Sequence, residues 1–195
     1  MKKKTYLILI SGLILSQDLL AQTGFCDGSI PNEWPDSRYF VEEINGDQVV
    51  TDNKTGLMWQ RCILGYTPVN HTCEFIQGNT FNYTWLEALE SAQALNNNGG
   101  YADYTDWRVP NIQELITLAA TNCRAPAANS NVFPSMISNH QIYLSSTPSK
   151  YDARFNNLPD TGKAVWTVHF QFGEVSGSFS QERDATVYLV RGSGY

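Results

Sequence analysis

The side chains best suited to contact a ligand lie together in residues 149–157, a segment without helical or strand periodicity. Long loops of this kind often carry the binding residues of a domain. Two aromatic rings can stack on a sugar or a peptide, while a guanidinium group and two amides can form directional hydrogen bonds. The candidates for ligand contact are Tyr151, Arg154, Phe155, Asn156 and Asn157, with a solvated loop as the alternative interpretation.

Two expected strands extend this candidate surface. Residues 164–172 alternate between two faces, with Trp166, Val168, Phe170 and Phe172 on the apolar one. A turn at Gly173-Glu174 leads into a second strand over residues 175–180. We expect the polar faces of the two strands to contribute His169, Gln171, Ser176 and Ser178, with Gln181, Glu182 and Arg183 at the rim.

Enzyme chemistry finds little support in the sequence. It contains no GxSxG elbow, no HExxH helix and no glycine loop for a phosphate. His71, His140 and His169 are scattered and no CxxC pair exists, which disfavours a zinc site. Asp103 and Asp106 could hold Ca²⁺, but no loop of alternating oxygen ligands surrounds them. We expect no catalysis, no cofactor and no resident metal.

The first residues are typical of a secretory signal peptide. Lys2, Lys3 and Lys4 precede an apolar run over residues 6–15, which is too short to span a bilayer, and Ala21 offers a cleavage site. We expect residues 1–21 to be removed, leaving a secreted, periplasmic or surface protein without a membrane span. The formal charge of −6 then becomes −8, because three lysines and one aspartate are lost. So acidic a chain is a poor partner for nucleic acid.

The four cysteines predict two disulfides, because an even count in an exported chain is typical of a stapled domain. The sequence allows three pairings. A local link between Cys62 and Cys73, across a short turn-rich stretch, is the simplest closure. It would leave Cys26 to join the N-terminal arm to Cys123.

The length of 195 residues, 42% of them hydrophobic, suits a single folded domain. We expect an irregular arm over residues 22–37, which are rich in Pro, Asp, Asn and Gly, and one domain over residues 38–195. Strands over residues 38–43 and 48–51 flank Asn45-Gly46, a dipeptide that favours a tight hairpin turn. Shorter apolar segments predict further strands over residues 57–62, 142–145 and 185–191.

Two capping boxes predict two helices. Thr84 is followed three residues later by Glu87, and an apolar stripe continues to Leu95 at helical spacing. Asn111 and Glu114 repeat the same offset before a second, shorter stripe. Two helices among antiparallel hairpins predict an α+β domain.

Several conspicuous residues are better explained by the scaffold than by a site. Trp59, Trp85 and Trp166 lie within apolar patterns and are expected in the core. Asp106, Trp107 and Arg108 suggest a core anchor with a local ion pair. We expect Arg191, in the last strand, to pair with a buried carbonyl or carboxylate.

An ordered set of motifs resembles the DUF1566 family, which is also called the C-terminal domain of the Legionella collagen-like adhesin. The resemblance covers residues 38–192, and its most specific parts are Val50–Cys62 and Asp106–Leu115. Shorter agreements are Phe133-Pro134, Tyr143–Thr147, Trp166–Phe170 and Val190–Gly192.

The resemblance implies a C-type-lectin-like fold, with two helices and twisted antiparallel sheets. It also implies a non-enzymatic ligand-binding role, with an extracellular or envelope glycan or protein as the partner. The binding face would lie in residues 147–184, and an oligomer is compatible with this role. The alternative function is a structural or interaction subunit of an envelope or pilus assembly.

Overall fold

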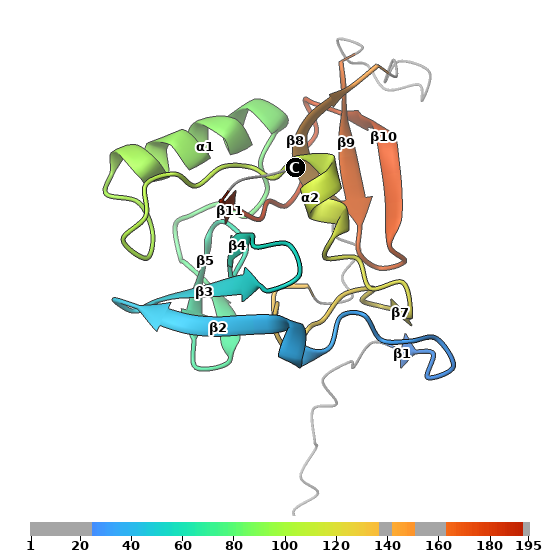
Figure 1. Cartoon of the computed structure of the whole chain (residues 1–195). Coiled ribbons are helices and arrows are strands. Elements are labelled where there is room, and N and C mark those ends of the chain that lie inside the picture. Colours follow the sequence, from blue (N-terminus) through green and yellow to red (C-terminus); the bar gives the residue numbers. More distant parts are fainter. Residues whose placement is uncertain (1–24, 137–141, 151–162, 193–195) are drawn as a thin grey trace, which may run out of the picture.

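The computed structural model describes residues 25–136, 142–150 and 163–192. Within them the chain forms two α-helices and eleven strands, most of which lie in two antiparallel sheets (Figure 1). The predicted α+β class is therefore confirmed.

The first sheet contains the predicted N-terminal hairpin. Its strands β2 (Tyr39–Ile44), β3 (Asp47–Asp52), β4 (Met58–Gln60) and β11 (Val190–Arg191) lie in the order β11-β4-β3-β2. Asn45 and Gly46 join β2 to β3 with φ angles of 53° and 90°, as a tight hairpin turn requires. The dipeptide therefore predicted the turn correctly.

The second sheet carries the predicted polar face. It consists of β8 (Ile142–Ser149), β9 (Ala164–His169) and β10 (Glu174–Ser180), in the order β10-β9-β8. The prediction that the middle strand continues to Phe172 was wrong. The chain already turns after His169, whose carbonyl accepts the backbone N–H of Gly173 at 3.0 Å. Phe172 consequently lies in the turn, 55% exposed.

The last segment, residues 185–191, is strand only at its end. Residues 185–190 are all buried, in agreement with their apolar composition. They run from the second sheet to the first and make isolated bridges from Ala185 to Tyr83, from Thr186 to Tyr143 of β8 and from Val190 to Arg108. Val190 also pairs with Trp59 of β4. The segment therefore links both sheets but does not form the continuous strand that we predicted.

Both predicted helices begin at their capping boxes. Thr84 caps α1 (Trp85–Asn97) and Asn111 caps α2 (Ile112–Ile116), each with the reciprocal hydrogen bonds to the glutamate three residues on. The indole Nε1 of Trp85 donates to the carbonyl of Ser145 at 3.1 Å, which ties α1 to β8. The short α2 packs against β8 and β9 (Figure 1).

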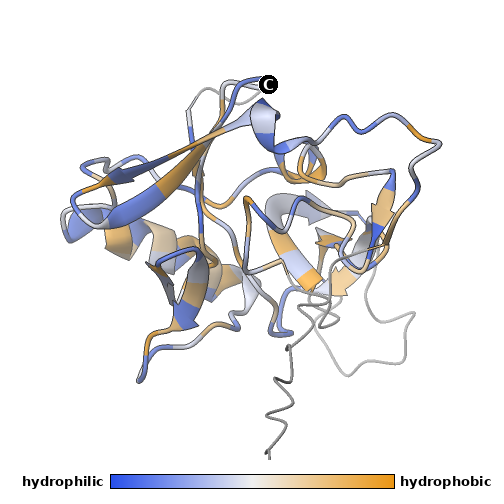
Figure 2. Cartoon of the chain, turned by 90° about the horizontal axis from the view of Figure 1, so that it is seen from below, coloured by the Kyte–Doolittle hydropathy of each residue, from blue (hydrophilic) through white to orange (hydrophobic). Residues whose placement is uncertain are grey.

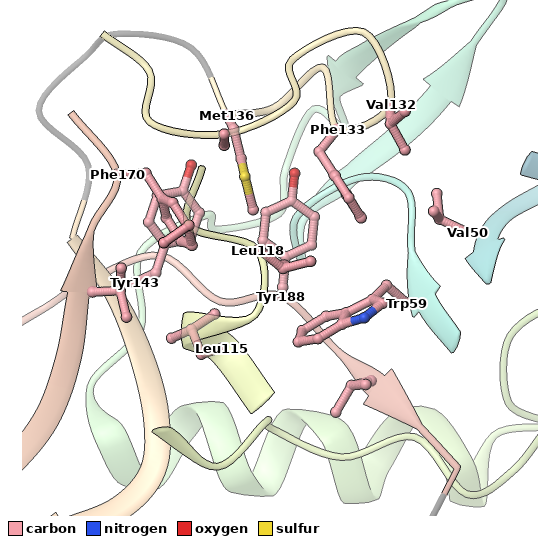
Figure 3. Packing of buried hydrophobic residues seen from close by; sticks show 14 of the residues in the cluster. Val50, Trp59, Leu115, Leu118, Val132, Phe133, Met136, Tyr143, Phe170 and Tyr188 are labelled. Carbon is pink, nitrogen blue, oxygen red and sulfur yellow. The ribbon is translucent and has the colours of Figure 1, made fainter. Parts of the chain in front are cut away.

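The two sheets and the helices enclose an aromatic core. Figure 3 shows side chains from distant parts of the chain converging in it, among them Trp59, Phe133, Tyr143 and Tyr188. The rings of Tyr143 and Tyr188 stack with their centroids 5.7 Å apart. Figure 2 shows hydrophobic residues, coloured orange, on strands and helices alike. The adjacent residues Val49 and Val50 of β3 are both fully buried, Val50 in this core and Val49 in a second hydrophobic cluster, so both faces of that strand are covered.

The two disulfides follow the expected pairing. Cys62 joins Cys73, and Cys26 joins Cys123 across a sequence separation of 97 residues. The arm is less irregular than predicted, since β1 (Phe25–Cys26) pairs with β7 (Cys123–Arg124) and a 3₁₀ turn, η1, covers Asp36–Arg38. The stretch between Cys62 and Cys73 likewise contains a hairpin, formed by β5 (Tyr66–Val69) and β6 (Thr72–Phe75). Backbone pairing between the linked cysteines explains the extra strands at the arm.

Two adjacent glycines after α1 differ in the space that a side chain would have. Gly99 and Gly100 both have positive φ angles, 102° and 82°. A Cβ atom on Gly99 would have nothing within 4 Å, whereas one on Gly100 would overlap the backbone oxygen of Tyr104. We expect Gly99→Ala to lower the free energy of unfolding by about 1–2 kcal/mol, the cost of left-handed backbone. Gly100→Ala should add about 1–3 kcal/mol to that loss.

Urea unfolding of the two variants measures this difference. Equal destabilisation by the two substitutions would show that the loop accommodates the extra carbon, contrary to the expected overlap with Tyr104.

Candidate functional site

The register of the second sheet aligns polar residues on one face. Ile142, His169 and Glu174 lie directly opposite one another across the three strands. Thr167 and Ser176 form the next pair on that face. Because neighbours in register share a face, these side chains project in the same direction.

A hollow of about 580 Å³ lies on this face, which we call the sheet hollow. A register shift between Ser176 and Phe179 marks a bulge in β10, and the hollow is also lined by Ser178 and Phe179. The complete lining consists of Ile142, Thr167, His169, Glu174, Val175, Ser176, Ser178, Phe179 and Arg183.

Four residues of the predicted surface meet in the sheet hollow: His169, Ser176, Ser178 and Arg183. Three others lie elsewhere. Gln171 is in the β9–β10 turn, where its carbonyl accepts the N–H of Ala125 at 2.7 Å. Gln181 donates its side-chain amide to the carbonyl of Ala164 at 3.1 Å, and the exposed Glu182 follows β10. The loop candidates Tyr151, Arg154, Phe155, Asn156 and Asn157 lie outside the described residues.

The sheet hollow offers hydroxyl groups, a negative charge from Glu174 and a positive charge from Arg183. Its apolar floor consists of the side chains Ile142, Val175 and Phe179. The hydroxyls of Ser176 and Ser178 are 3.1 Å apart, and the Thr167 hydroxyl donates to the carbonyl of Ser176 at 3.3 Å. The Arg183 guanidinium lies over the ring of Phe179, 5.0 Å from its centroid. Such a set can hydrogen-bond a polyhydroxylated ligand and at the same time cover part of its apolar surface.

Sequence reasoning missed part of this lining. Glu174 was expected in a turn, and neither Val175 nor Phe179 was among the predicted ligand contacts. The misplacement of the turn by three residues hid the alignment of Glu174 with His169. Phe172, expected to be buried, instead lies beside His169 with the ring centroids 6.0 Å apart. A correct prediction of the turn over residues 170–173 would have placed both Glu174 and Phe172 beside His169.

The tripeptide before α2 forms two separate ion pairs. Arg108 donates to both carboxylate oxygens of Glu114, at 2.7 and 2.6 Å. Asp106 accepts from Arg191 Nε at 2.7 Å. The ion pair expected within the tripeptide is thus replaced by two longer-range ones, and the partner carboxylate of Arg191 is exposed rather than buried. The tryptophan between them, Trp107, is buried as expected.

The other tryptophans expected in the core differ in burial. Trp59 is fully buried in the cluster shown in Figure 3. Trp85 and Trp166 are half-buried and pack at the edges of the core.

Asp103, the other aspartate considered for Ca²⁺, accepts a hydrogen bond from the side chain of Asn45 at 2.7 Å. Within the described residues, no three His, Cys, Asp or Glu side chains gather as metal ligands.

A buried ion pair joins Arg38, which directly precedes β2, to Asp52, the last residue of β3. Asp52 accepts from Arg38 Nε at 2.8 Å and from a second guanidinium nitrogen at 2.6 Å, and both side chains are almost inaccessible to solvent. Burial alone would raise the pKa of Asp52, but hydrogen bonds from Arg38, Lys54 and Thr55, with the charge of Arg38, lower it below its usual value.

Comparison with known families establishes the relationship of the chain to other proteins. The sequence model of the family described as the Lcl C-terminal domain matches residues 48–191. The chain belongs to the Lcl C-terminal domain family. This confirms the family resemblance of its motifs. The match includes all three strands of the second sheet, so the sheet hollow belongs to the Lcl C-terminal domain itself. Among curated proteins, none matches the chain.

In the part of the chain that the structure describes, neither helix combines the length and the apolar character that crossing a bilayer requires.

Proposed function

We propose that this Lcl C-terminal domain is an exported, non-enzymatic recognition domain that binds an extracellular or envelope ligand through the sheet hollow. Its scaffold would be C-type-lectin-like, and its role adhesin-like, with a glycan as the ligand. The observation that carries the proposal is the convergence of Ser176, Ser178, His169 and Arg183 around an apolar floor.

Two further features support this proposal. All four cysteines are paired, which favours an oxidising compartment and leaves none as a thiol nucleophile. The mixed charges of the hollow, from Glu174 and Arg183, favour a hydroxyl-rich ligand over a polyanion. The acidic net charge of the chain works in the same direction.

A pair of matched arginine variants tests the proposed site on an array of neutral and anionic glycans. Arg183 and Arg124 are both exposed and both lie over a phenylalanine ring, 5.0 Å from Phe179 and 4.9 Å from Phe25. Only Arg183 lines the sheet hollow. We expect Arg183→Ala to weaken glycan binding about tenfold or more, because a charge-assisted hydrogen bond is lost. Arg124→Ala should leave binding within about twofold.

The outcome can also favour another function or another site. Equal loss of binding in both variants, with folding intact, would reject the sheet hollow. Binding to no glycan, together with capture of a single envelope protein, would favour the alternative of a subunit in an envelope or pilus assembly.

A further inference from the structure

The N-terminal arm is held firmly against a distant loop. The Cys26–Cys123 disulfide joins the two covalently. The side-chain amide of Asn129 donates to the carbonyl of Trp34 at 2.9 Å and to Asp36 Oδ1 at 2.7 Å. The indole of Trp34 donates in turn to the carbonyl of Thr117 at 2.7 Å. The space between arm and loop is therefore preformed.

This space is a second hollow, of about 220 Å³, which we call the arm hollow. It is smaller than the usual pocket for a drug-sized ligand, so a group of side-chain size suits it best. Among the described residues that line it are one carboxylate and no basic side chain. The lining consists of Cys26, Asn32, Trp34, Asp36, Ala120, Cys123, Pro126, Ala128, Asn129, Ser130 and Asn131.

The carboxylate of Asp36 keeps the capacity to bind a further donor. Its Oδ1 accepts from Asn129, and its Oδ2 accepts from Asn131 at a long 3.4 Å. Each carboxylate oxygen offers two lone pairs, so each can accept one more hydrogen bond. Asp36 is exposed, so a ligand can reach it without opening the fold.

The indole of Trp34 adds a second preference for positive charge. An aromatic face attracts a cation, and a tryptophan face does so most strongly. Trp34 also lines a neighbouring groove, where the Arg38 guanidinium already lies over the indole, 5.7 Å from the ring centroid, and where Arg38 and Lys54 repel a further cation. The acidic net charge of the chain further favours a cationic ligand over an anionic one.

We propose that the arm hollow binds an organic cation, a primary ammonium group on a short carbon chain. The ammonium would donate to Asp36, and the carbon chain would lie against Trp34 and the small apolar residues beside it. This site is separate from the sheet hollow, with which it shares no residue, and it does not depend on the function proposed above.

Titration with n-butylammonium, followed by nuclear magnetic resonance of the Trp34 indole N–H and the Asn129 amide, tests the proposal. We expect saturable shifts with a Kd of about 1–10 mM, which is reasonable for a ligand of this size. Butanol, of similar shape but uncharged, and the anion butyrate should bind about tenfold more weakly or not at all. Equal binding of butanol, or shifts that do not saturate, would overturn the proposal.

Two substitutions in the arm test whether the negative charge of Asp36 binds n-butylammonium. Asp36→Asn should weaken n-butylammonium binding about tenfold or more, because it removes the carboxylate and preserves the shape. Glu33→Gln removes an equal charge on the same arm, but the Glu33 side chain faces Lys54, so binding should be unchanged. Equal affinity of Asp36→Asn and the unmodified protein would reject the site.

Two controls keep the result interpretable. The Trp34 indole N–H reports whether the arm stays docked in Asp36→Asn, since it is hydrogen-bonded to Thr117. If that variant undocks the arm, the comparison of n-butylammonium with butanol on the unmodified protein decides. Displacement of n-butylammonium by calcium chloride, but not by sodium chloride of equal ionic strength, would identify an inorganic cation site and contradict the proposal.

Discussion

Asp52→Asn should destabilise the domain by about 3–5 kcal/mol, since breaking a buried ion pair leaves one charge without its counterpart. The side chain of Asp52 has no exposed area, and that of Arg38 is 6% exposed. Four donors surround the carboxylate: two guanidinium nitrogens of Arg38, the backbone N–H of Lys54 and the hydroxyl of Thr55. An asparagine can satisfy only some of them, because its amide nitrogen is itself a donor.

A neighbouring ion pair provides the matched control. Lys54 and Glu33 also form a short contact, at 2.8 Å, but both side chains are more than half exposed. Lys54→Ala should therefore cost less than about 1 kcal/mol. Urea unfolding at neutral pH measures both variants, and a loss of under 1 kcal/mol for Asp52→Asn would show that the buried pair is not a major determinant of stability.

The carboxylate of Asp52 makes the difference in stability between the unmodified protein and Asp52→Asn depend on pH. Because folding lowers the pKa of Asp52, its contribution is fully present above the unfolded-state pKa, which is about 3.9. It is lost as the pH falls through the lower folded-state pKa. The gap in stability between the unmodified protein and Asp52→Asn should consequently shrink below about pH 4. A gap that stays constant down to about pH 2 would contradict this assignment.

Alkaline unfolding should be cooperative and driven by buried tyrosines. Burial raises the pKa of Tyr39, Tyr101, Tyr143 and Tyr188 well above the usual value near 10, and it raises that of Tyr83 by less. Each of them therefore stays protonated in the folded state at a pH where the unfolded state loses its proton. The stability that they contribute is fully present below about pH 10 and falls as the pH rises further.

The expected loss is about 1.4 kcal/mol per pH unit for each of these four tyrosines, or roughly 5–6 kcal/mol per unit together. That is comparable with the whole stability of an ordinary domain, so we expect unfolding between about pH 11 and 12. Phenolate absorbance and the loss of near-ultraviolet circular dichroism should change together. With all four cysteines paired, no thiolate is present to start disulfide exchange.

Tyr188→Phe separates this cause from general charge repulsion. Removing one ionisable ring should reduce the slope of stability against pH above about pH 10 by one quarter. Ionisation of the buried tyrosines without unfolding, seen as phenolate absorbance in a protein that keeps its circular dichroism, would disprove the mechanism.

Local signals in the sequence predicted the elements whose partners are close along the chain. Both capping boxes join residues three positions apart, and the turn at Asn45-Gly46 depends on the backbone preferences of two adjacent residues. The Cys62–Cys73 disulfide spans only 11 residues. Such features form within one short segment, so their residues alone largely determine them.

The family could also be recognised from the sequence, because its motifs are ordered strings of residues. The matched region, residues 48–191, contains both of the most specific strings completely. The site could be predicted only in part. Alternation placed His169, Ser176 and Ser178 on polar faces, but it could not show which strands lie next to each other or in which register.

Only the tertiary structure decided the arrangements that join distant residues. The path of residues 185–190 between the sheets, the pairing of Asp106 with Arg191, and the closure of the arm hollow by Asn129 all bring together residues far apart in sequence. The sequence by itself determined the helices, the first hairpin, the cysteine content and the family. Periodicity specifies which face of a strand is apolar, whereas the neighbours of that face depend on how the whole chain packs into one low-energy core.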